Sequence, residues 1–176
     1  MKIQLPGGCS ISHFRHSDRD DLVANLEDGT VQEWTLLIPF PYTAENANEW
    51  LTLAVPEGDV SPTNWAVRDE SDRQIGGIGF MQNSGRASHV AEIGYWIAKP
   101  WRGRGIMTEA VIAICDHGFR HLGLARITAG IFTGNNGSAR VLEKAGFVIE
   151  APLGRKCYRK DGRFIDAVLY AKVAED

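Results

Sequence analysis

A strand, a glycine turn and a helix follow one another within residues 91–109, and this segment constrains the fold more than any other. Residues 90–97 are mainly β-branched, aliphatic or aromatic, which favours a strand. Lys99-Pro100 ends it, because proline has no backbone donor and restricts the residue before it. From Met107 onward, apolar residues recur at helical spacing, which predicts a helix with one face against a sheet.

The turn between strand and helix, Arg102-Gly103-Arg104-Gly105, is a candidate anion site. The first turn of a helix has backbone N–H groups without intrahelical partners, and the helix dipole adds partial positive charge there. Glycines let such a backbone approach a bulky anion, for example a pyrophosphate. Lys99 adds a further charge. An ordinary turn with solvated arginines is the alternative, but the preceding strand, the helix start and the cations together favour anion binding.

Two motifs carry a resemblance to a known superfamily. Residues 102–107, Arg-Gly-Arg-Gly-Ile-Met, resemble the Arg/Gln-x-x-Gly-x-Gly/Ala motif of the GNAT acyl-CoA-dependent N-acetyltransferases, with Met107 in place of the usual Gly or Ala. Residues 91–97 and 135–147 are similar to the RimJ/RimL-type branch, which contains the ribosomal-protein-alanine N-acetyltransferases. The matching pieces span residues 11–171. Two motifs in the right order and at the right separation are far more specific than either alone.

The resemblance implies an α/β (α+β) chain with the GNAT fold, a mixed, mostly antiparallel sheet of six to seven strands with helices on both faces. Its central strands, near residues 93 and 128, are expected to run parallel and then splay apart. Backbone groups left unpaired by the splay need hydrogen-bond partners, which the pantetheine arm of the cofactor supplies in this family. The local patterns predict strands at residues 10–14, 64–68, 74–82, 89–97, 125–132, 147–149 and 165–171, and helices after Ser17, Thr43, Gly105 and Asn135.

Capping and turn residues set the expected ends of these elements. Ser17 is expected to cap the first helix and Thr43 the second, because their hydroxyls can accept a free N–H of the first turn. Gly146 is expected to end the last helix. The glycines at positions 76, 77 and 79 indicate a bulge or a close backbone approach, and Asp161-Gly162 predicts a turn.

Composition narrows the class of protein. At 176 residues the chain is expected to form one domain, residues 1–176. A net charge of −3 gives no overall basic field, which argues against a nucleic-acid partner. Cys9, Cys115 and Cys157 form no Cys-x-x-Cys pair, so neither a disulfide framework nor a zinc site is expected. No export signal or membrane-spanning segment is evident, so we expect a cytoplasmic protein without a metal or a membrane partner.

The resemblance also implies that acetyl-CoA (coenzyme A) is the acyl donor. Its pantetheine arm would pair with the backbone of residues 95–97, its pyrophosphate would lie on the glycine turn, and Asn135 would bond the pantetheine amide. Helix capping is the alternative role for Asn135 and Ser138. The expected cofactor-binding residues are Tyr95, Trp96, Ile97, Arg102, Gly103, Arg104, Gly105, Ile106, Met107, Thr108, Asn135 and Ser138.

Amine acylation by a thioester needs a neutral amine, an oxyanion stabiliser and a proton for the departing thiolate. A backbone N–H near Tyr95 or Trp96 could polarise the thioester carbonyl. Ser138 and Tyr158 each carry a hydroxyl that could supply the proton. Glu92, on the central strand, matches the carboxylate that some relatives use as a base, directly or through water. A solvated strand glutamate is the alternative, and the sequence does not decide between the two.

Residues 31–42 combine two prolines with aromatic and large aliphatic side chains. They are either a loop packed on the core or a wall of the acceptor pocket, since aromatic loops on a rigid scaffold often form ligand sites. The resemblance favours the pocket. The expected substrate-binding residues are Trp34, Phe40, Tyr42 and Glu92.

The sequence therefore predicts an N-acetyltransferase that moves an acetyl group to a primary amine by direct attack. The amine would belong to a protein N-terminus, an amino acid or another small molecule, and a homodimer is a candidate assembly. A covalent route through Cys157 has no evident histidine partner. The alternative from a different class is a non-catalytic domain that binds acyl-CoA as a sensor or interaction module, which predicts coenzyme A binding without turnover.

Overall fold

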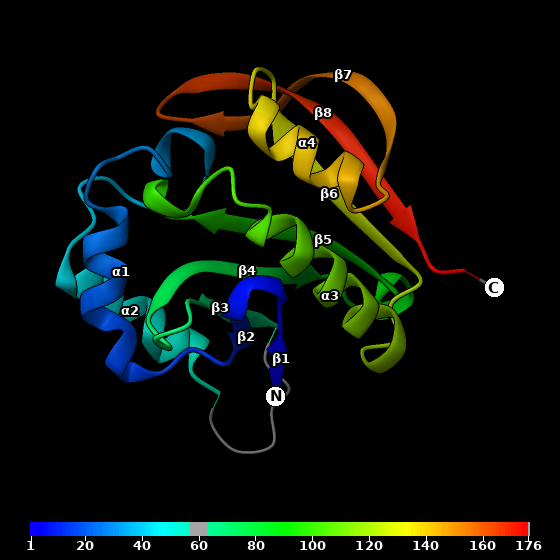
Figure 1. The fold of residues 1–176 in the computed structure, drawn as a ribbon. Coiled ribbons are helices and arrows are strands. Elements are labelled where there is room, and N and C mark those ends of the chain that lie inside the picture. Colours follow the sequence, from blue (N-terminus) through cyan, green and yellow to red (C-terminus); the bar gives the residue numbers. More distant parts are fainter. Residues whose placement is uncertain (57–62, 176) are drawn as a thin grey trace. The chain divides into compact units, whose positions relative to one another are not determined.

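The computed structural model describes residues 1–56 and 63–175 of the chain (Figure 1). The strands are β1 (Lys2–Gln4), β2 (Ser10–Ser12), β3 (Asn64–Arg68), β4 (Gln74–Gln82), β5 (Val90–Ile97), β6 (Arg126–Phe132), β7 (Val148–Lys160) and β8 (Arg163–Val173). The helices are α1 (Arg19–Leu26), α2 (Ala44–Ala54), α3 (Ile106–His121) and α4 (Asn136–Lys144), and short 3-10 turns join several of the elements.

The eight strands of the described residues form one mixed sheet in the order β1-β2-β3-β4-β5-β6-β8-β7. β5 and β6 are parallel, whereas β1–β2, β2–β3, β3–β4, β6–β8 and β7–β8 are antiparallel. The expected mixed, mostly antiparallel fold with a parallel central pair is thus confirmed. The expected count of six to seven strands was too low, because β1 has only three residues and no hydrophobic period that would reveal it.

The chain clusters into two compact units, which are described one at a time. The first unit contains residues 1–79 and 95–110, and the second contains residues 80–94 and 111–176. β4, β5 and α3 each contribute residues to both units. The expectation that residues 1–176 form a single domain stays a prediction.

The helix start in the first unit differs from the expected one. Ser17 lies inside a 3-10 turn, His16–Asp18, and α1 begins only at Arg19, so Ser17 does not cap it. Asp18 stands at the N-cap position of α1 without a side-chain capping bond, and its Oδ2 instead accepts the backbone N–H of Arg15, at the start of the 3-10 turn, at 2.8 Å. The carboxylate of Asp18 is buried, and it binds a buried arginine of the sheet. This partner is 50 residues away in the chain, so local sequence patterns cannot reveal it.

That arginine, Arg68 at the end of β3, is a fully buried charge of the first unit, with a side-chain exposure of 1%. Its guanidinium donates to both carboxylate oxygens of Asp18 at 2.8 Å. Ser12 Oγ and the carbonyl oxygens of His13 and Asp72 accept its other three N–H groups at 2.6, 3.0 and 3.2 Å. All five donors are therefore satisfied, which compensates for the removal of the charge from water.

The core of the first unit lies between its helices and β3. Thr43 caps α2 as expected, with its Oγ1 accepting the N–H of Asn46 at 3.3 Å. Tyr42 belongs to this core, and burial raises the pKa of its hydroxyl to about 12. The cluster of buried side chains comprises Phe14, Leu22, Leu26, Val31, Tyr42, Ala47, Leu51, Ala54 and Ala66.

The close backbone approach predicted from the glycines of β4 is confirmed in the first unit. A Cβ on Gly76 would lie 2.6 Å from the carbonyl oxygen of Trp96, and one on Gly77 would lie 2.7 Å from Trp96 Nε1. A Cβ on Gly79 would lie 2.6 Å from the carbonyl oxygen of Thr63. Side chains are excluded at these positions because real Cβ atoms do not come so close to other heavy atoms.

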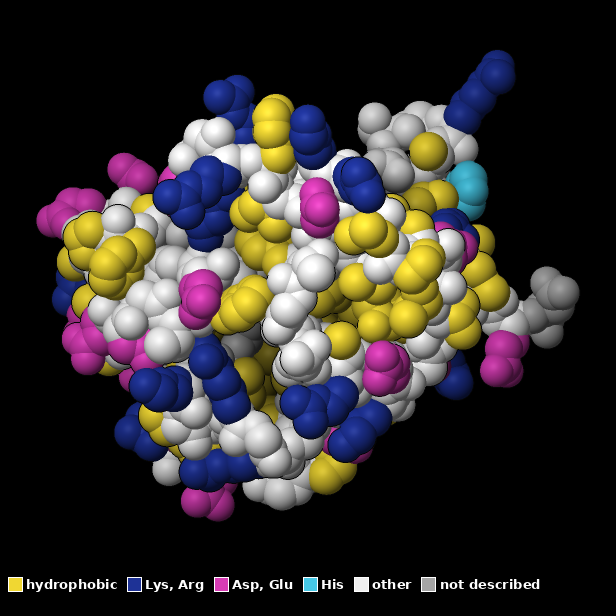
Figure 2. All heavy atoms as spheres, turned by 90° about the horizontal axis from the view of Figure 1, so that it is seen from above, with side chains coloured by type: hydrophobic (Ala, Val, Ile, Leu, Met, Phe, Trp, Pro, Cys, Tyr) yellow, Lys and Arg dark blue, Asp and Glu magenta, His cyan; other side chains and the backbone are white. Residues whose placement is uncertain are grey.

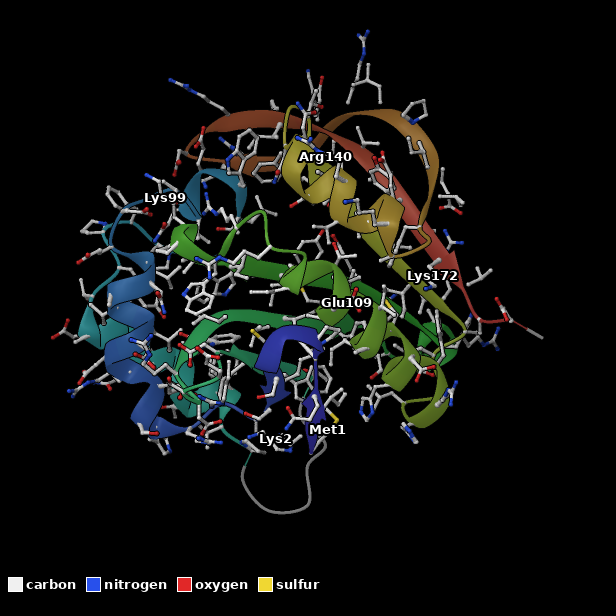
Figure 3. All side chains as sticks on the ribbon, viewed as in Figure 1. Met1, Lys2, Lys99, Glu109, Arg140 and Lys172 are labelled. Atoms are coloured by element: carbon white, nitrogen blue, oxygen red, sulfur yellow. The ribbon has the colours of Figure 1, made fainter. Side chains whose placement is uncertain are left out.

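The second unit is built on β6, β8 and β7, with α4 joining β6 to β7. α4 ends where Gly146 adopts φ 84°, as expected, and Lys172 on β8 donates to the carbonyl oxygen of Ala145 at 2.7 Å (Figure 3). The hairpin β7–β8 turns at Asp161-Gly162, both with positive φ, which is the geometry of a tight hairpin turn.

β7 is much longer than the strand expected at residues 147–149. β7 has thirteen residues, Val148–Lys160, and it pairs with β8 in a ladder that three register shifts interrupt. β7 lies at the edge of the sheet, and most of its side chains are exposed. An exposed edge strand needs no apolar alternation, so its basic and polar sequence resembles a loop.

Candidate active site

Two residues expected to act in catalysis meet in the second unit. Glu92 lies on β5, where it is half-buried and paired with Thr128 of the parallel strand β6. Tyr158 lies on β7 and donates its hydroxyl to Glu92 Oε1 at 3.1 Å. The two positions are 66 residues apart in the chain, so the sequence suggested each one but could not show that they touch.

The environment of Tyr158 keeps its hydroxyl protonated. Burial raises the pKa of this phenol well above its usual value of 10, and the charge of Glu92 and the hydrogen bond to it raise the pKa further. The ring also lies against Phe132, with the ring centroids 5.7 Å apart. The Tyr158 hydroxyl therefore keeps its proton at neutral pH and donates a hydrogen bond to the side chain of Glu92.

Gly130 on β6 makes room for this contact. A Cβ at position 130 would lie 1.8 Å from Tyr158 Oη and 2.8 Å from its Cζ. No side chain fits there unless the tyrosine moves. Gly130 was not among the site residues predicted from the sequence, although a glycine inside a strand pattern is a signal of close approach.

We expect Gly130→Ala to displace Tyr158 from Glu92 and to lower kcat about tenfold or more, as loss of a positioned proton donor would. The pKa of Tyr158 should fall back toward its usual value, so the alkaline loss of activity should begin at lower pH than in the wild type. The measurement is the pH profile of kcat in a double-mutant cycle with Tyr158→Phe. If Gly130→Ala lowered kcat by the same factor in the wild type and in the Tyr158→Phe background, Gly130 would not act by making room for Tyr158.

The glycine turn lies in the first unit and has the features of an anion site. Gly103 and Gly105 adopt φ 75° and 79°, and a Cβ on either would meet nothing within 4 Å. α3 begins directly afterwards at Ile106, with its first N–H groups at this turn. Met107, the departure from the usual motif, is 5% exposed, so its long side chain is buried and does not occupy the turn.

The cations of this turn are exposed but held by neighbours of the first unit. Arg102 donates to Thr30 Oγ1 at 2.9 Å and to the carbonyl oxygen of Ile97 at 3.2 Å. Thr30 in turn donates twice to Asp28, which lowers the pKa of that carboxyl, and the charges of Lys99 and Arg102 lower it further. The guanidinium of Arg104 lies 4.8 Å from the ring centroid of Trp101. These positively charged groups fit a polyanion such as a pyrophosphate.

The parallel ladder between β5 and β6 is short. Within the part of the second unit that the structure describes, it consists of Val90↔Arg126, Ala91↔Ile127 and Glu92↔Thr128. β6 continues to Phe132 and pairs with β8 throughout. The last pair of the parallel ladder therefore contains Glu92 itself.

The remaining candidates for cofactor binding have local roles in the structure. In the first unit, Trp96 packs on the hydrophobic core and Ile106 is buried, while Thr108 is half-buried. In the second unit, Asn135 Oδ1 accepts the backbone N–H of Ser138 at 3.2 Å and so caps α4. The capping role is observed, and contacts of Tyr95, Asn135 or Ser138 with a pantetheine stay predictions.

The three aromatic residues expected in the acceptor pocket occupy different environments of the first unit. Tyr42 is buried in the core, Trp34 is half-buried at the end of a 3-10 turn, and Phe40 is 64% exposed. Phe40 lies close to Gly29, where a Cβ would be 3.0 Å from its ring. Their role in substrate binding stays a prediction. Within residues 1–56 and 63–175, no group of three or more His, Cys, Asp or Glu side chains could hold a metal.

Comparisons with known proteins all find acetyltransferases. Residues 10–148 match the model of the acetyltransferase (GNAT) domain. YjcK of Bacillus subtilis (strain 168), named a probable N-acetyltransferase, is 43% identical over 105 residues, which cover 60% of this chain and 58% of that protein. The ribosomal protein uS5-alanine N-acetyltransferase of Escherichia coli (strain K12) is 31% identical over 109 residues, which cover 61% and 56%. The match thus spans less than two thirds of either relative.

A solved structure shares the fold over nearly the whole length. RimL, a ribosomal L7/L12 alpha-N-protein acetyltransferase in complex with coenzyme A, has a TM-score of 0.82 and covers 98% of both chains. Its sequence identity to this chain is 16%, so this likeness concerns the fold alone. In the described part of this chain, no helix has both the length and the apolar character needed to cross a bilayer.

Proposed function

This chain belongs to the acetyltransferase (GNAT) family, and on that premise we propose that it is an acetyl-CoA-dependent N-acetyltransferase acting on a primary amine. The observation that carries the proposal is the hydrogen bond from Tyr158 Oη to Glu92 Oε1. A carboxylate and a protonated hydroxyl in contact are the two groups that direct attack of an amine on a thioester needs.

The glycine turn and the start of α3 would hold the pyrophosphate of the donor. Gly103 and Gly105 leave their backbone N–H groups open to a bulky anion, and Lys99, Arg102 and Arg104 supply the positive charge. When bound, acetyl-CoA supplies an acetyl thioester, which leaves a thiolate that needs a proton. Asn135 and Ser138, at the start of α4, are the further candidates for contact with its pantetheine arm.

Glu92 and Tyr158 handle the protons. The Glu92 carboxylate receives a proton from the acceptor amine, which must be neutral to attack. Tyr158 Oη holds a proton for the leaving group and recovers one from Glu92 along their hydrogen bond. The amine loses one proton and the leaving group gains one, so both residues end the cycle as they began. Ser138 is the alternative proton donor.

The acceptor is a primary amine of a polypeptide N-terminus, an amino acid or another small molecule. The name of the Escherichia coli relative supports the first of these, since it is an alanine N-acetyltransferase of a ribosomal protein. We place the reaction in the cytoplasm. The free thiols of Cys9, Cys115 and Cys157 fit that compartment.

A thiol-release assay tests the proposal. The chain is incubated with acetyl-CoA and a panel of alanine-starting peptides, L-amino acids and polyamines, and we expect thiol release that depends on the amine. Mass spectrometry should find one added acetyl group on the amine. Binding of coenzyme A without transfer to any amine would contradict the proposal and favour the sensor or interaction domain.

A further inference from the structure

A group of cations on the β7–β8 hairpin has no part in the chemistry proposed above. Residues 153–164, called the basic hairpin here, contain five Lys or Arg side chains and one carboxylate, although the whole chain has a net charge of −3. Figure 2 shows Lys and Arg side chains beside exposed hydrophobic ones on the face viewed there. The cations of the basic hairpin are Arg155, Lys156, Arg159, Lys160 and Arg163.

Four of these cations have no carboxylate partner within residues 1–56 and 63–175. Among the residues that the structure describes, no ion pair involves Arg155, Lys156, Arg159 or Arg163. The neighbouring carboxylate of Asp166 accepts the backbone N–H of Lys156 at 2.8 Å rather than its ammonium. The hairpin therefore has a net positive charge, and these four cations are not neutralised by ion pairs within the described residues.

Two of the cations are held in place by an aromatic ring. Lys156 Nζ lies 5.2 Å from the ring centroid of Phe164, and the guanidinium of Arg159 lies 5.9 Å from it. Such contacts stabilise a cation over a ring face and restrict its motion. Phe164 is 60% exposed, and these cations would compete with a nucleic-acid base for stacking on its ring.

The basic hairpin is continuous with the reacting pair. Tyr158, which touches Glu92, lies on β7 between Lys156 and Arg159. Leu153, further back on the same strand, is 51% exposed, and β7 is the edge strand of the sheet. An extended chain bound on β7 near Tyr158 would therefore lie beside cations and an apolar side chain.

We propose that the basic hairpin binds an acidic segment of the acceptor, so that the substrate is the N-terminus of a polypeptide whose first residues are followed by several Asp or Glu. This assignment rests on the proposed acetyl transfer and names its substrate class. Charge complementarity is the argument for this partner, because unpaired cations around a reacting centre attract an anionic substrate and orient it.

The test uses two peptides that share the same three N-terminal residues and continue with either Asp/Glu or Ser/Gln. We expect the wild type to have a kcat/KM about tenfold or more higher for the acidic peptide, through KM, with the difference shrinking at high salt. Arg155→Glu together with Arg163→Glu should abolish the preference for the acidic peptide. Neither side chain has an ion pair within the described chain, so the substitutions break none. The kcat/KM for a small amine that carries no other charged group should stay unchanged.

A matched control and a binding measurement separate the possible failures. Arg86→Glu with Lys144→Glu makes the same charge change on exposed residues outside the hairpin, which also have no ion pair within the described chain, and should keep the preference. Fluorescence anisotropy of labelled peptides measures their binding independently of acetyl transfer. Preferential binding of the acidic peptide without acetylation of any amine would refute the proposed function but not the inference about the hairpin. Equal binding of both peptides, or equal loss in the control, would overturn the inference. Tighter binding of a single-stranded RNA at the hairpin would assign it to nucleic acid instead.

Discussion

Glu92→Gln is expected to lower kcat by about 10²–10⁴, the usual contribution of a positioned proton acceptor. The amide has nearly the same shape as the carboxylate and can still accept a hydrogen bond from Tyr158 through its oxygen. It cannot take a proton from the amine at neutral pH. The KM for acetyl-CoA should change little, because Glu92 is not one of the residues of the glycine turn that would hold the pyrophosphate of the donor. Steady-state kinetics with a good acceptor amine measures both constants.

Two variants make this result specific. Glu49→Gln removes the same charge at an exposed position of α2 and should leave kcat unchanged. Tyr158→Phe should lower kcat by a smaller factor, and its effect should nearly vanish in the Glu92→Gln background, because the two side chains act through one hydrogen bond. Full activity of Glu92→Gln would rule out its role as the base. Additive effects of the two changes would argue against the proposed relay.

Arg68→Ala is expected to cause the largest loss of stability, about 3–5 kcal/mol, because it leaves the Asp18 carboxylate buried without its partner. The side chains of Arg68 and Asp18 are 1% and 4% exposed, so water cannot replace the lost contact. Ser12 and His13 would lose their donor as well. Urea unfolding at constant pH measures the change in the free energy of unfolding.

The exposed ion pair of Arg120 and Asp116, one helical turn apart on α3, supplies the comparison. Arg120→Ala should cost no more than about 0.5 kcal/mol, since surface pairs contribute little. Arg68→Met combined with Asp18→Asn should be less destabilising than Arg68→Ala alone, because it removes both buried charges. If Arg68→Ala were as mild as Arg120→Ala, the buried pair would not stabilise the first unit as the geometry implies.

Local sequence patterns determined much of the fold. The strands Asn64–Arg68 and Gln74–Gln82 have the bounds that the sequence predicts, because apolar strand residues are flanked there by polar turns. Thr43 and Gly146 bound their helices as expected, since capping depends on residues only a few positions apart. The motif at residues 102–107 likewise placed a glycine turn at the start of α3.

Tertiary structure decided the features that depend on distant partners. Ser17 does not cap α1, because Asp18 holds the N-cap position, where its carboxylate binds Arg68, 50 residues further along the chain. β7 is long because β8 pairs with it, whereas its own sequence carries no apolar alternation. The contact of Tyr158 with Glu92 requires an empty place at Gly130 on a third strand. A sequence specifies local geometry through neighbouring residues, but only the folded sheet brings these three strands together, and with them the proton-transfer pair on which the proposed activity depends.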